Sequence, residues 1–222
     1  MAENTVAAEL IDKLFGTPGA VGAANAWQLM RVALRLLAVG EPITGAQLAA
    51  AAGVSETDLE RAIAGRDIEY DEQHRIVGWG LTRNPTPHKF SVDGKQLYTW
   101  CAPDTLIFPA VIGRTAHIES PCPTTGTIIR LTVDPDAGIS GLQPSAAVVS
   151  IVAASQVDLR AVRATLCRPQ HFFVTPDAAR DWQSRYPGMT VLPVAEAYTA
   201  IIRPLADAML AGIGPDRSAE PG

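Results

Sequence analysis

LYTWCAPDTLIFPA, the stretch from Leu97 to Ala110, passes from strand-like to helix-like residues near its midpoint. Pro103 suits the first turn of a helix, because its fixed φ is already helical and its missing N–H would have no partner there. Cys101 is therefore expected at or just before a helix N-terminus, with Asp104 in the first turn. The positive end of the helix dipole favours a thiolate, so Cys101 is predicted to be more reactive than an average cysteine. On spacing alone, the alternative is a buried core cysteine with Asp104 as a capping residue.

The composition around this stretch describes an ordinary globular chain of one or two domains. It has 222 residues, of which 47% are hydrophobic and 18% charged, and a formal net charge of −5. Nucleic acids and anionic membranes require a clustered positive face, so neither is expected as a partner. The N-terminus shows no basic and apolar leader and no apolar run is long enough to span a bilayer, so we expect a cytoplasmic location. Three cysteines without a C-x-x-C pair argue against a disulfide framework or a four-cysteine zinc site.

The region before the stretch carries helical patterns, capping signals and a hairpin. Apolar spacing predicts helices at residues 3–15 and 24–39, a capping box at Thr44 predicts one at 44–51, and an N-cap at Ser55 predicts one at 55–64. Two short β-prone runs predict a hairpin at residues 68–79. Three helices and a hairpin are typical of a winged helix-turn-helix. The helix that would read DNA carries three acidic residues against one arginine, which is the wrong balance for phosphates. We predict a winged-helix-like domain over residues 1–83 that does not bind DNA.

The region after residue 83 mixes strands and helices. A polar, Pro-rich segment from Thr82 to Pro87 marks the predicted domain junction. A hairpin with Asp93-Gly94 as its type I′ turn then leads to Cys101 and a helix that runs to about Ile112. Further strands are predicted at 116–119, 127–133, 146–152, 172–174 and 191–192, and further helices at 157–165, 176–186 and 195–210. Because no regular βαβ repeat is present, we predict a mixed, mainly antiparallel α+β catalytic domain over residues 84–211 and a disordered tail at 212–222.

Two separated blocks of the sequence resemble a known enzyme family. The first reads Leu97-Tyr98-x-Trp100-Cys101-Ala102-x-Asp104-Thr105-Leu106-Ile107-Phe108-Pro109-Ala110-x-Ile112-Gly113-Arg114-Thr115-Ala116. The second reads Cys167-x-x-x-His171-Phe172-Phe173, followed by Asp181-Trp182. Together they resemble the segments that carry the two catalytic cysteines and the catalytic aspartate of the organomercurial (alkylmercury) lyases. The resemblance continues upstream through Glu69-Tyr70-Asp71 and Ile76-x-Gly78-x-Gly80-Leu81-Thr82, and covers the chain from about residue 30 to about residue 200.

The resemblance implies a reaction and a set of roles. Cys101 and Cys167 would bind mercury as thiolates, which suit a soft cation, and Asp104 would relay a proton to the carbon of the carbon–mercury bond. The products would be a hydrocarbon and mercury(II) held between the two cysteines. Arg168, beside Cys167, would favour its thiolate, whereas Cys122 between two prolines is expected to be structural. Tyr98, Trp100 and Phe108 are candidates to line a pocket for the organic group, although aromatic residues of this kind more often pack in a core.

The family implies partners as well as residues. No metal or organic cofactor is expected, an external thiol would strip the product, and a mercuric reductase would accept mercury(II). The winged-helix-like part of such enzymes does not serve as a repressor, and here it is expected to cover one side of the site.

Two other classes of protein compete with the lyase. One is a thiol-based metal- or redox-sensing winged-helix transcriptional regulator, which would bind a specific DNA sequence in an electrophoretic shift assay. The other is a zinc-dependent hydrolase, with Cys167 and His171 joined by Cys101 or Cys122 as ligands. It would purify with zinc.

Overall fold

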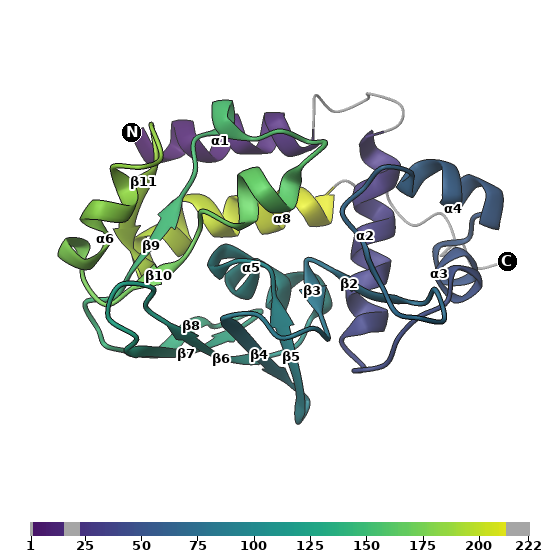
Figure 1. Ribbon diagram of the computed structural model, residues 1–222, viewed down its shortest axis with the longest axis horizontal. Coiled ribbons are helices and arrows are strands. Elements are labelled where there is room, and N and C mark those ends of the chain that lie inside the picture. The colour runs from purple at the N-terminus through teal and green to yellow at the C-terminus, as the bar shows by residue number, and fades with distance from the viewer. Residues whose placement is uncertain (1, 16–22, 212–222) are drawn as a thin grey trace, which may run out of the picture.

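Antiparallel strands form the framework of the protein. The computed structural model describes residues 2–15 and 23–211. Within them, one sheet has the strand order β1-β2-β3-β5-β4-β6-β7-β8 and a smaller one the order β10-β9-β11, with every pairing antiparallel (Figure 1). The strands are β1 Glu69–Tyr70, β2 Ile76–Trp79, β3 Leu81–Thr82, β4 His88–Val92, β5 Lys95–Thr99, β6 Ala116–Pro121, β7 Ile128–Asp134, β8 Gly138–Gln143, β9 Val148–Ile151, β10 Phe172–Phe173 and β11 Thr190–Pro193.

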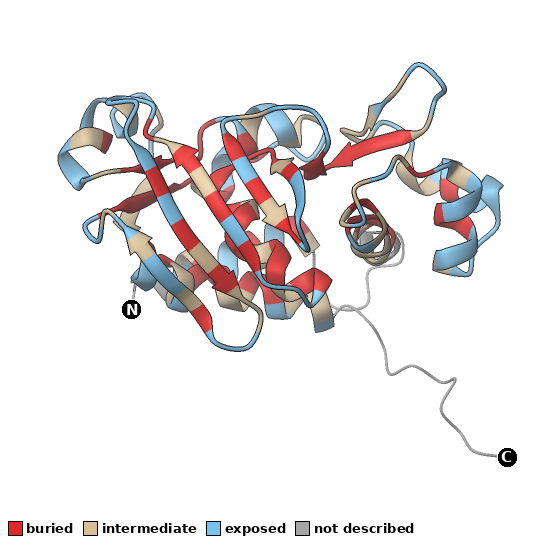
Figure 2. Cartoon of the chain, turned by 90° about the horizontal axis from the view of Figure 1, so that it is seen from below, coloured by how far each residue is buried: buried red, intermediate tan, exposed pale blue. Residues whose placement is uncertain are grey.

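The helices lie at the ends of the chain and over one face of the large sheet. They are α1 Ala2–Phe15, α2 Ala23–Leu37, α3 Gly45–Ala52, α4 Glu56–Ile63, α5 Ala102–Ile112, α6 Pro176–Gln183, α7 Val194–Ala197 and α8 Arg203–Ala211. In β4, β6 and β7 alternate residues are buried (Figure 2), which is the pattern of a sheet with one face on the core. The predicted mixed α+β fold with mainly antiparallel pairing is confirmed.

The N-terminal helices follow their capping signals. Thr44 accepts a hydrogen bond from the Gln47 N–H while the Gln47 side chain accepts one from the Thr44 N–H, so the predicted capping box begins α3. Ser55 caps α4 through the Asp58 N–H. Helices α2, α3 and α4 form the helix-turn-helix part, whereas α1 lies along α8 (Figure 1). The sheet itself continues across the predicted junction, because Thr82 of β3 pairs with both β2 and β5.

Helix α5 occupies the centre of the molecule and is apolar on nearly every side. Most of its residues are buried, as expected of a helix that is apolar all round and has no polar face for solvent. The hairpin of β4 and β5 delivers the chain to it through Asp93 and Gly94. These have φ values of +48° and +73°, so both central residues adopt the left-handed conformation that the predicted type I′ turn requires.

The second half of the chain differs from the sequence prediction in two places. The helix predicted over residues 157–165 is replaced by a 3-10 turn at Ala154–Gln156, a loop, and a π-helical turn at Arg163–Cys167. In the loop, Thr165 Oγ1 accepts a hydrogen bond from the Asp158 N–H and Asp158 Oδ1 accepts one from the Arg160 N–H, so side chains take donors that a helix would use. Strand β8 was not predicted, because its glycines weaken the β pattern.

Two further points concern a membrane and the C-terminus. Among the described residues, no helix has the length and apolar character needed to cross a bilayer. The predicted tail at 212–222 lies outside the described residues.

The turn between β2 and β3 depends on Gly80, and this predicts a stability difference. Its φ is +77°, and a Cβ there would lie 2.7 Å from Phe108 Cζ and 2.9 Å from Met30 Cε. We predict that Gly80→Ala lowers the free energy of unfolding in urea by about 2–5 kcal/mol, because overpacking adds to the cost of a left-handed backbone. Gly53→Ala is the control: its φ is +68° but its Cβ would meet nothing within 4 Å, so it should cost about 1–2 kcal/mol. Equal losses would contradict the packing argument.

Candidate active site

The first half of the site is the junction between β5 and α5. Cys101 is the N-cap of α5, with extended backbone at φ −147°, and Pro103 and Asp104 follow in the first turn. This placement was predicted from the proline and the apolar residues after it. The Cys101 side chain is 1% exposed. Cys101 Sγ accepts a hydrogen bond from Gln170 Nε2–H at 4.0 Å, and Gln170 Oε1 accepts one from the Val152 N–H at 3.2 Å.

The second half of the site comes from the π-helical turn that ends at Cys167. The structure brings Cys167 to Cys101 and Asp104, so that both sulfurs and a carboxylate oxygen lie within 4.8 Å of one another. A backbone hydrogen bond from the Ala102 N–H to the Gln170 carbonyl, at 3.3 Å, joins the two segments. The three residues proposed from the sequence as catalytic therefore form one cluster, although Cys167 lies 66 positions after Cys101 in the sequence.

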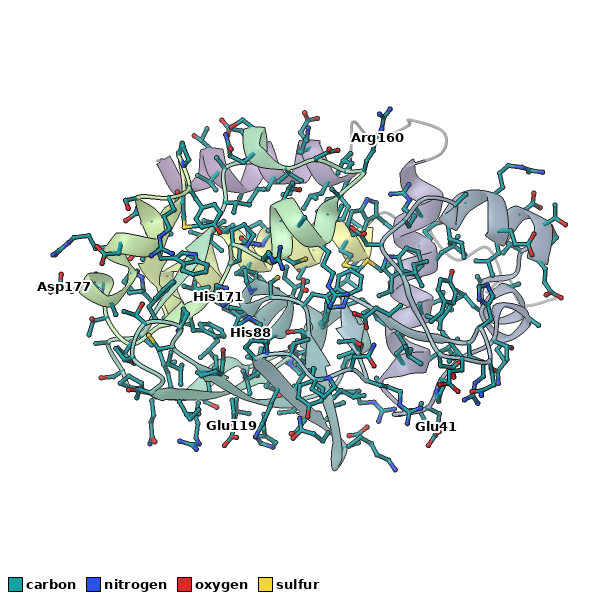
Figure 3. The ribbon with its side chains drawn as sticks, viewed as in Figure 1. Glu41, His88, Glu119, Arg160, His171 and Asp177 are labelled. Carbon is teal, nitrogen blue, oxygen red and sulfur yellow. The ribbon has the colours of Figure 1, made fainter. Side chains whose placement is uncertain are left out.

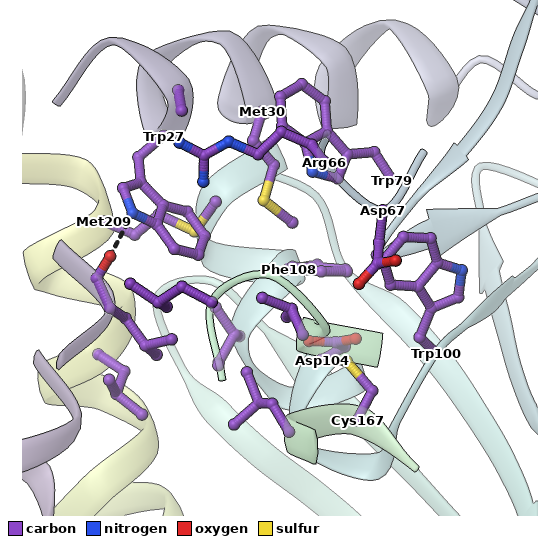
Figure 4. A pocket seen from close by; sticks show the side chains of 18 of the residues that line it. Trp27, Met30, Arg66, Asp67, Trp79, Trp100, Asp104, Phe108, Cys167 and Met209 are labelled. Atoms are coloured by element: carbon purple, nitrogen blue, oxygen red, sulfur yellow. Dashed lines mark hydrogen bonds between the residues drawn. The ribbon is translucent and has the colours of Figure 1, made fainter. Parts of the chain in front are cut away.

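A mainly apolar cavity of about 90 Å³ ends at this cluster (Figure 4). Asp104 and Cys167 lie at one end of it, and Trp27 lies at the other, where its Nε1–H donates to the Leu14 carbonyl at 2.5 Å. The walls come from α1, α2, the turn before β3, α5, the segment 159–167 and α8, through Leu14, Phe15, Ala26, Trp27, Met30, Arg66, Asp67, Trp79, Gly80, Trp100, Asp104, Ile107, Phe108, Leu159, Val162, Leu166, Cys167, Leu205 and Met209. The N-terminal helices thus cover one side of the site.

Burial controls the protonation of all three reactive groups. Burial raises the pKa of Asp104 from 3.8 to about 7, against an opposing effect of hydrogen bonds from Cys101. Its Oδ2 is buried and has no hydrogen-bond partner among the described residues. Burial and the hydrogen bond with Cys167 raise the pKa of Cys101 well above its usual value. The hydrogen bond from Cys101 lowers the pKa of Cys167, but burial and the charges of Asp104 and Asp67 outweigh it, and the net shift is upward.

Burial outweighs the predicted effect of the helix dipole on Cys101, and the net shift of its pKa is upward. The helix N-terminus favours the charged form only modestly, whereas complete burial removes the water that would solvate it. The site therefore holds its thiol protons at neutral pH. Two protonated thiols beside a carboxyl group of pKa about 7 form a local proton reservoir.

The positive charge near Cys167 comes from Arg163, and the prediction that Arg168 supplies it is wrong. Arg163 lowers the pKa of Cys167, and its guanidinium lies 5.0 Å from the centre of the Trp100 ring. It forms a salt bridge with Glu69, and its backbone N–H donates to Asp67 Oδ2 at 2.9 Å. Glu69 of β1 and Asp67 just before it thereby hold the turn that carries Cys167.

The other sequence candidates lie in different places. Trp100 and Phe108 line the cavity, whereas Tyr98 is not among the lining residues. Cys122 is buried at the end of β6, where its N–H donates to the Thr127 carbonyl, and it does not belong to the cluster. The structure also leaves His171 out of the cluster. The expectation of a zinc site built on Cys167 and His171 therefore finds no matching group among the described residues.

His171 instead belongs to a buried ring contact with His88 (Figure 3). The two ring centres are 5.3 Å apart, and His88 Nδ1 lies 2.8 Å from Ser120 Oγ. Burial, followed by the charge of His171, lowers the pKa of His88 to about 3, so His88 is neutral at ordinary pH. This contact joins β4 to the residue just before β10.

Most of the cavity wall could not be found from the sequence. Trp27, Met30 and Met209 lie on amphipathic helices, where an apolar residue at helical spacing is expected to pack in a core. Asp67 carries no motif at all. The one usable signal was the aromatic content of the block around Cys101, which identified Trp100 and Phe108.

Comparisons with known proteins show which family the chain resembles. A family model described as alkylmercury lyase matches residues 81–206, and one described as helix-turn-helix domain of alkylmercury lyase matches residues 6–80. The chain is 50% identical over 198 residues to an alkylmercury lyase of Streptomyces lividans, covering 89% of this chain and 90% of that one. It is 49% identical over 171 residues to that of Staphylococcus epidermidis, covering 77% and 78%, and 43% identical over 169 residues to that of Pseudomonas putida, covering 74% and 77%.

A solved structure shares the fold. The mercury-bound form of MerB2 superimposes with a TM-score of 0.72 at 20% identity, covering 92% of this chain and 99% of that chain. Both halves of the sequence match family models, and the relatives match over most of their own length. The chain therefore belongs to the alkylmercury lyase family of enzymes.

Proposed function

We propose that this enzyme cleaves the carbon–mercury bond of organomercurials by protonolysis, with Cys101 and Cys167 as mercury ligands and Asp104 as the proton relay. The observation that carries the proposal is the cluster of two thiols and a carboxyl group within 4.8 Å, beside a mainly apolar cavity. The relatives named alkylmercury lyase support the same reaction class.

The spacing of the two sulfurs suits a single soft metal. Thiolates are the preferred protein ligands of soft cations. A metal bridged by two sulfurs needs them at about twice one metal–sulfur bond, which is about 2.3 Å for zinc. The two sulfurs lie within 4.8 Å of one another, close enough for one metal ion to contact both. One sulfur displaces the leaving ligand X of R–Hg–X, and the second raises the coordination number, which weakens the carbon–mercury bond.

The protonation of the site supplies what the reaction consumes. In total, R–Hg–X and two thiols give R–H, H–X and mercury(II) bound by two thiolates. Asp104 takes a thiol proton as sulfur bonds to mercury and passes it to the carbon that leaves. A carboxyl group with a pKa of about 7 can do both near neutral pH, because its two forms are similarly populated there.

The rest of the cavity suits the organic group and the fate of the product. Trp100 and Phe108 offer apolar surface beside the reacting atoms, and Trp27, Met30 and Met209 extend it. The groups named here need no resident cofactor. An external thiol is proposed to release mercury(II) from the two cysteines, and a mercuric reductase is its proposed acceptor. Cys122 is proposed to support the fold.

We predict that replacing either Cys101 or Cys167 abolishes turnover. We expect the purified enzyme to release benzene from phenylmercuric acetate with excess thiol, as measured by gas chromatography. Cys101→Ala and Cys167→Ala should release none, because one sulfur binds mercury but activates the carbon poorly, and both should still bind phenylmercury. Cys122→Ala is the matched control and should retain benzene release per folded molecule. A folded parent enzyme that releases no benzene would contradict the proposal.

We predict that replacing Asp104 with asparagine makes the folded protein more stable and abolishes its activity. The folded carboxyl group keeps its proton up to a pKa of about 7, against 3.8 normally. The unfolded chain binds fewer protons in this range, so this group makes stability fall as pH rises from about 4 to about 7, by up to about 4 kcal/mol. Asp104→Asn has no proton to lose, so urea unfolding should show a stability gap in its favour that grows over this range. Its benzene release should fall to background. A gap that is constant with pH, or retained activity, would contradict the assignment.

A further inference from the structure

The two cysteines of the cluster differ in how they face the cavity. Cys167 lines the cavity beside Asp104, and Figure 4 shows its sulfur next to the Asp104 carboxyl group. Cys101 is not among the lining residues. Both side chains are buried, Cys101 at 1% exposure and Cys167 at 3%, so the difference between them is that only Cys167 contributes to the cavity wall.

The residues around Cys101 hold its side chain away from the cavity wall. Gln170, itself 3% exposed, directs its amide N–H at the sulfur from 4.0 Å and is fixed by the Val152 N–H. The Ala102 N–H is bound to the Gln170 carbonyl, so the backbone beside Cys101 cannot turn toward the cavity without losing this bond. The turn that carries Cys167 is instead held so that its last residue faces inward.

From this asymmetry we infer an order of bond formation: Cys167 makes the first bond to mercury, and Cys101 makes the second. The inference rests on the proposed function, since it assigns an order to the same two ligands. In the first step the Cys167 thiol gives its proton to the Asp104 carboxylate, its sulfur bonds to mercury, and X leaves as an anion with its electron pair. Mercury on Cys167 is then within reach of Cys101, whose sulfur lies within 4.8 Å. As the Cys101 sulfur bonds to mercury, its thiol proton goes to the released X to give H–X, and the proton held by Asp104 goes to the carbon.

The first bond can be observed without turnover. A complex of phenylmercury with 2-nitro-5-thiobenzoate releases that coloured thiolate when a protein sulfur replaces it on mercury. We would mix this complex in a stopped-flow instrument with an excess of the enzyme, without external thiol, and record the visible absorbance. The variants are Cys101→Ser, Cys167→Ser and, as the matched control, Cys122→Ser. Urea unfolding confirms that each is folded, and alanine replaces serine in any that is not.

The expected result is a fast release that Cys101→Ser and Cys122→Ser retain and that Cys167→Ser slows by about tenfold or more, because the remaining thiol is misplaced for direct attack. A fast phase lost in Cys101→Ser but kept in Cys167→Ser would overturn the order. Equal slowing in both, or slowing in neither, would overturn it as well. Benzene release by the parent enzyme is measured separately, so failure of the order is distinguishable from failure of the proposed reaction.

Discussion

Exclusion of water from the start of α5 is the constraint on which the chemistry of this protein depends. A carboxyl group and two thiols are expensive to ionise when they are buried, so they keep protons that they would lose or share with water at the surface. Mercury(II) is a soft cation, and burial does not change its preference for sulfur ligands. A site that stores protons and offers sulfur suits a reaction in which protons are exchanged for metal.

The fold produces this environment by closing an apolar cavity from many directions. The sheet and α5 bring Cys101 and Asp104 to the centre, and the turn before β10 adds Cys167. Helices α1, α2 and α8, from opposite ends of the chain, complete the walls. The helix-turn-helix part thus contributes to the site through its buried side. The exposed side of α4 carries the acidic residues that led us to predict no DNA binding.

Local features of the chain could be predicted because their causes are local. The caps at Thr44 and Ser55, the Asp93-Gly94 turn and the proline at the start of α5 each act within a few residues. Cys167 was found only through the family resemblance, since nothing near it in the sequence indicates a position beside Cys101. The pKa of Cys101 was predicted in the wrong direction, because burial depends on segments far away in the chain. The loop at 157–162 was mistaken for a helix because its side-chain hydrogen bonds do not appear in an apolar pattern.

The central claim is that one mercury ion is held between Cys101 and Cys167 beside the apolar cavity. X-ray absorption at the mercury edge, on the protein loaded with one equivalent of mercury(II), tests it directly. We predict two sulfur neighbours in the parent protein and in a Cys122→Ser variant, and one in a Cys167→Ser variant. A single sulfur neighbour in the parent, or a sulfur lost on replacing Cys122, would contradict the account.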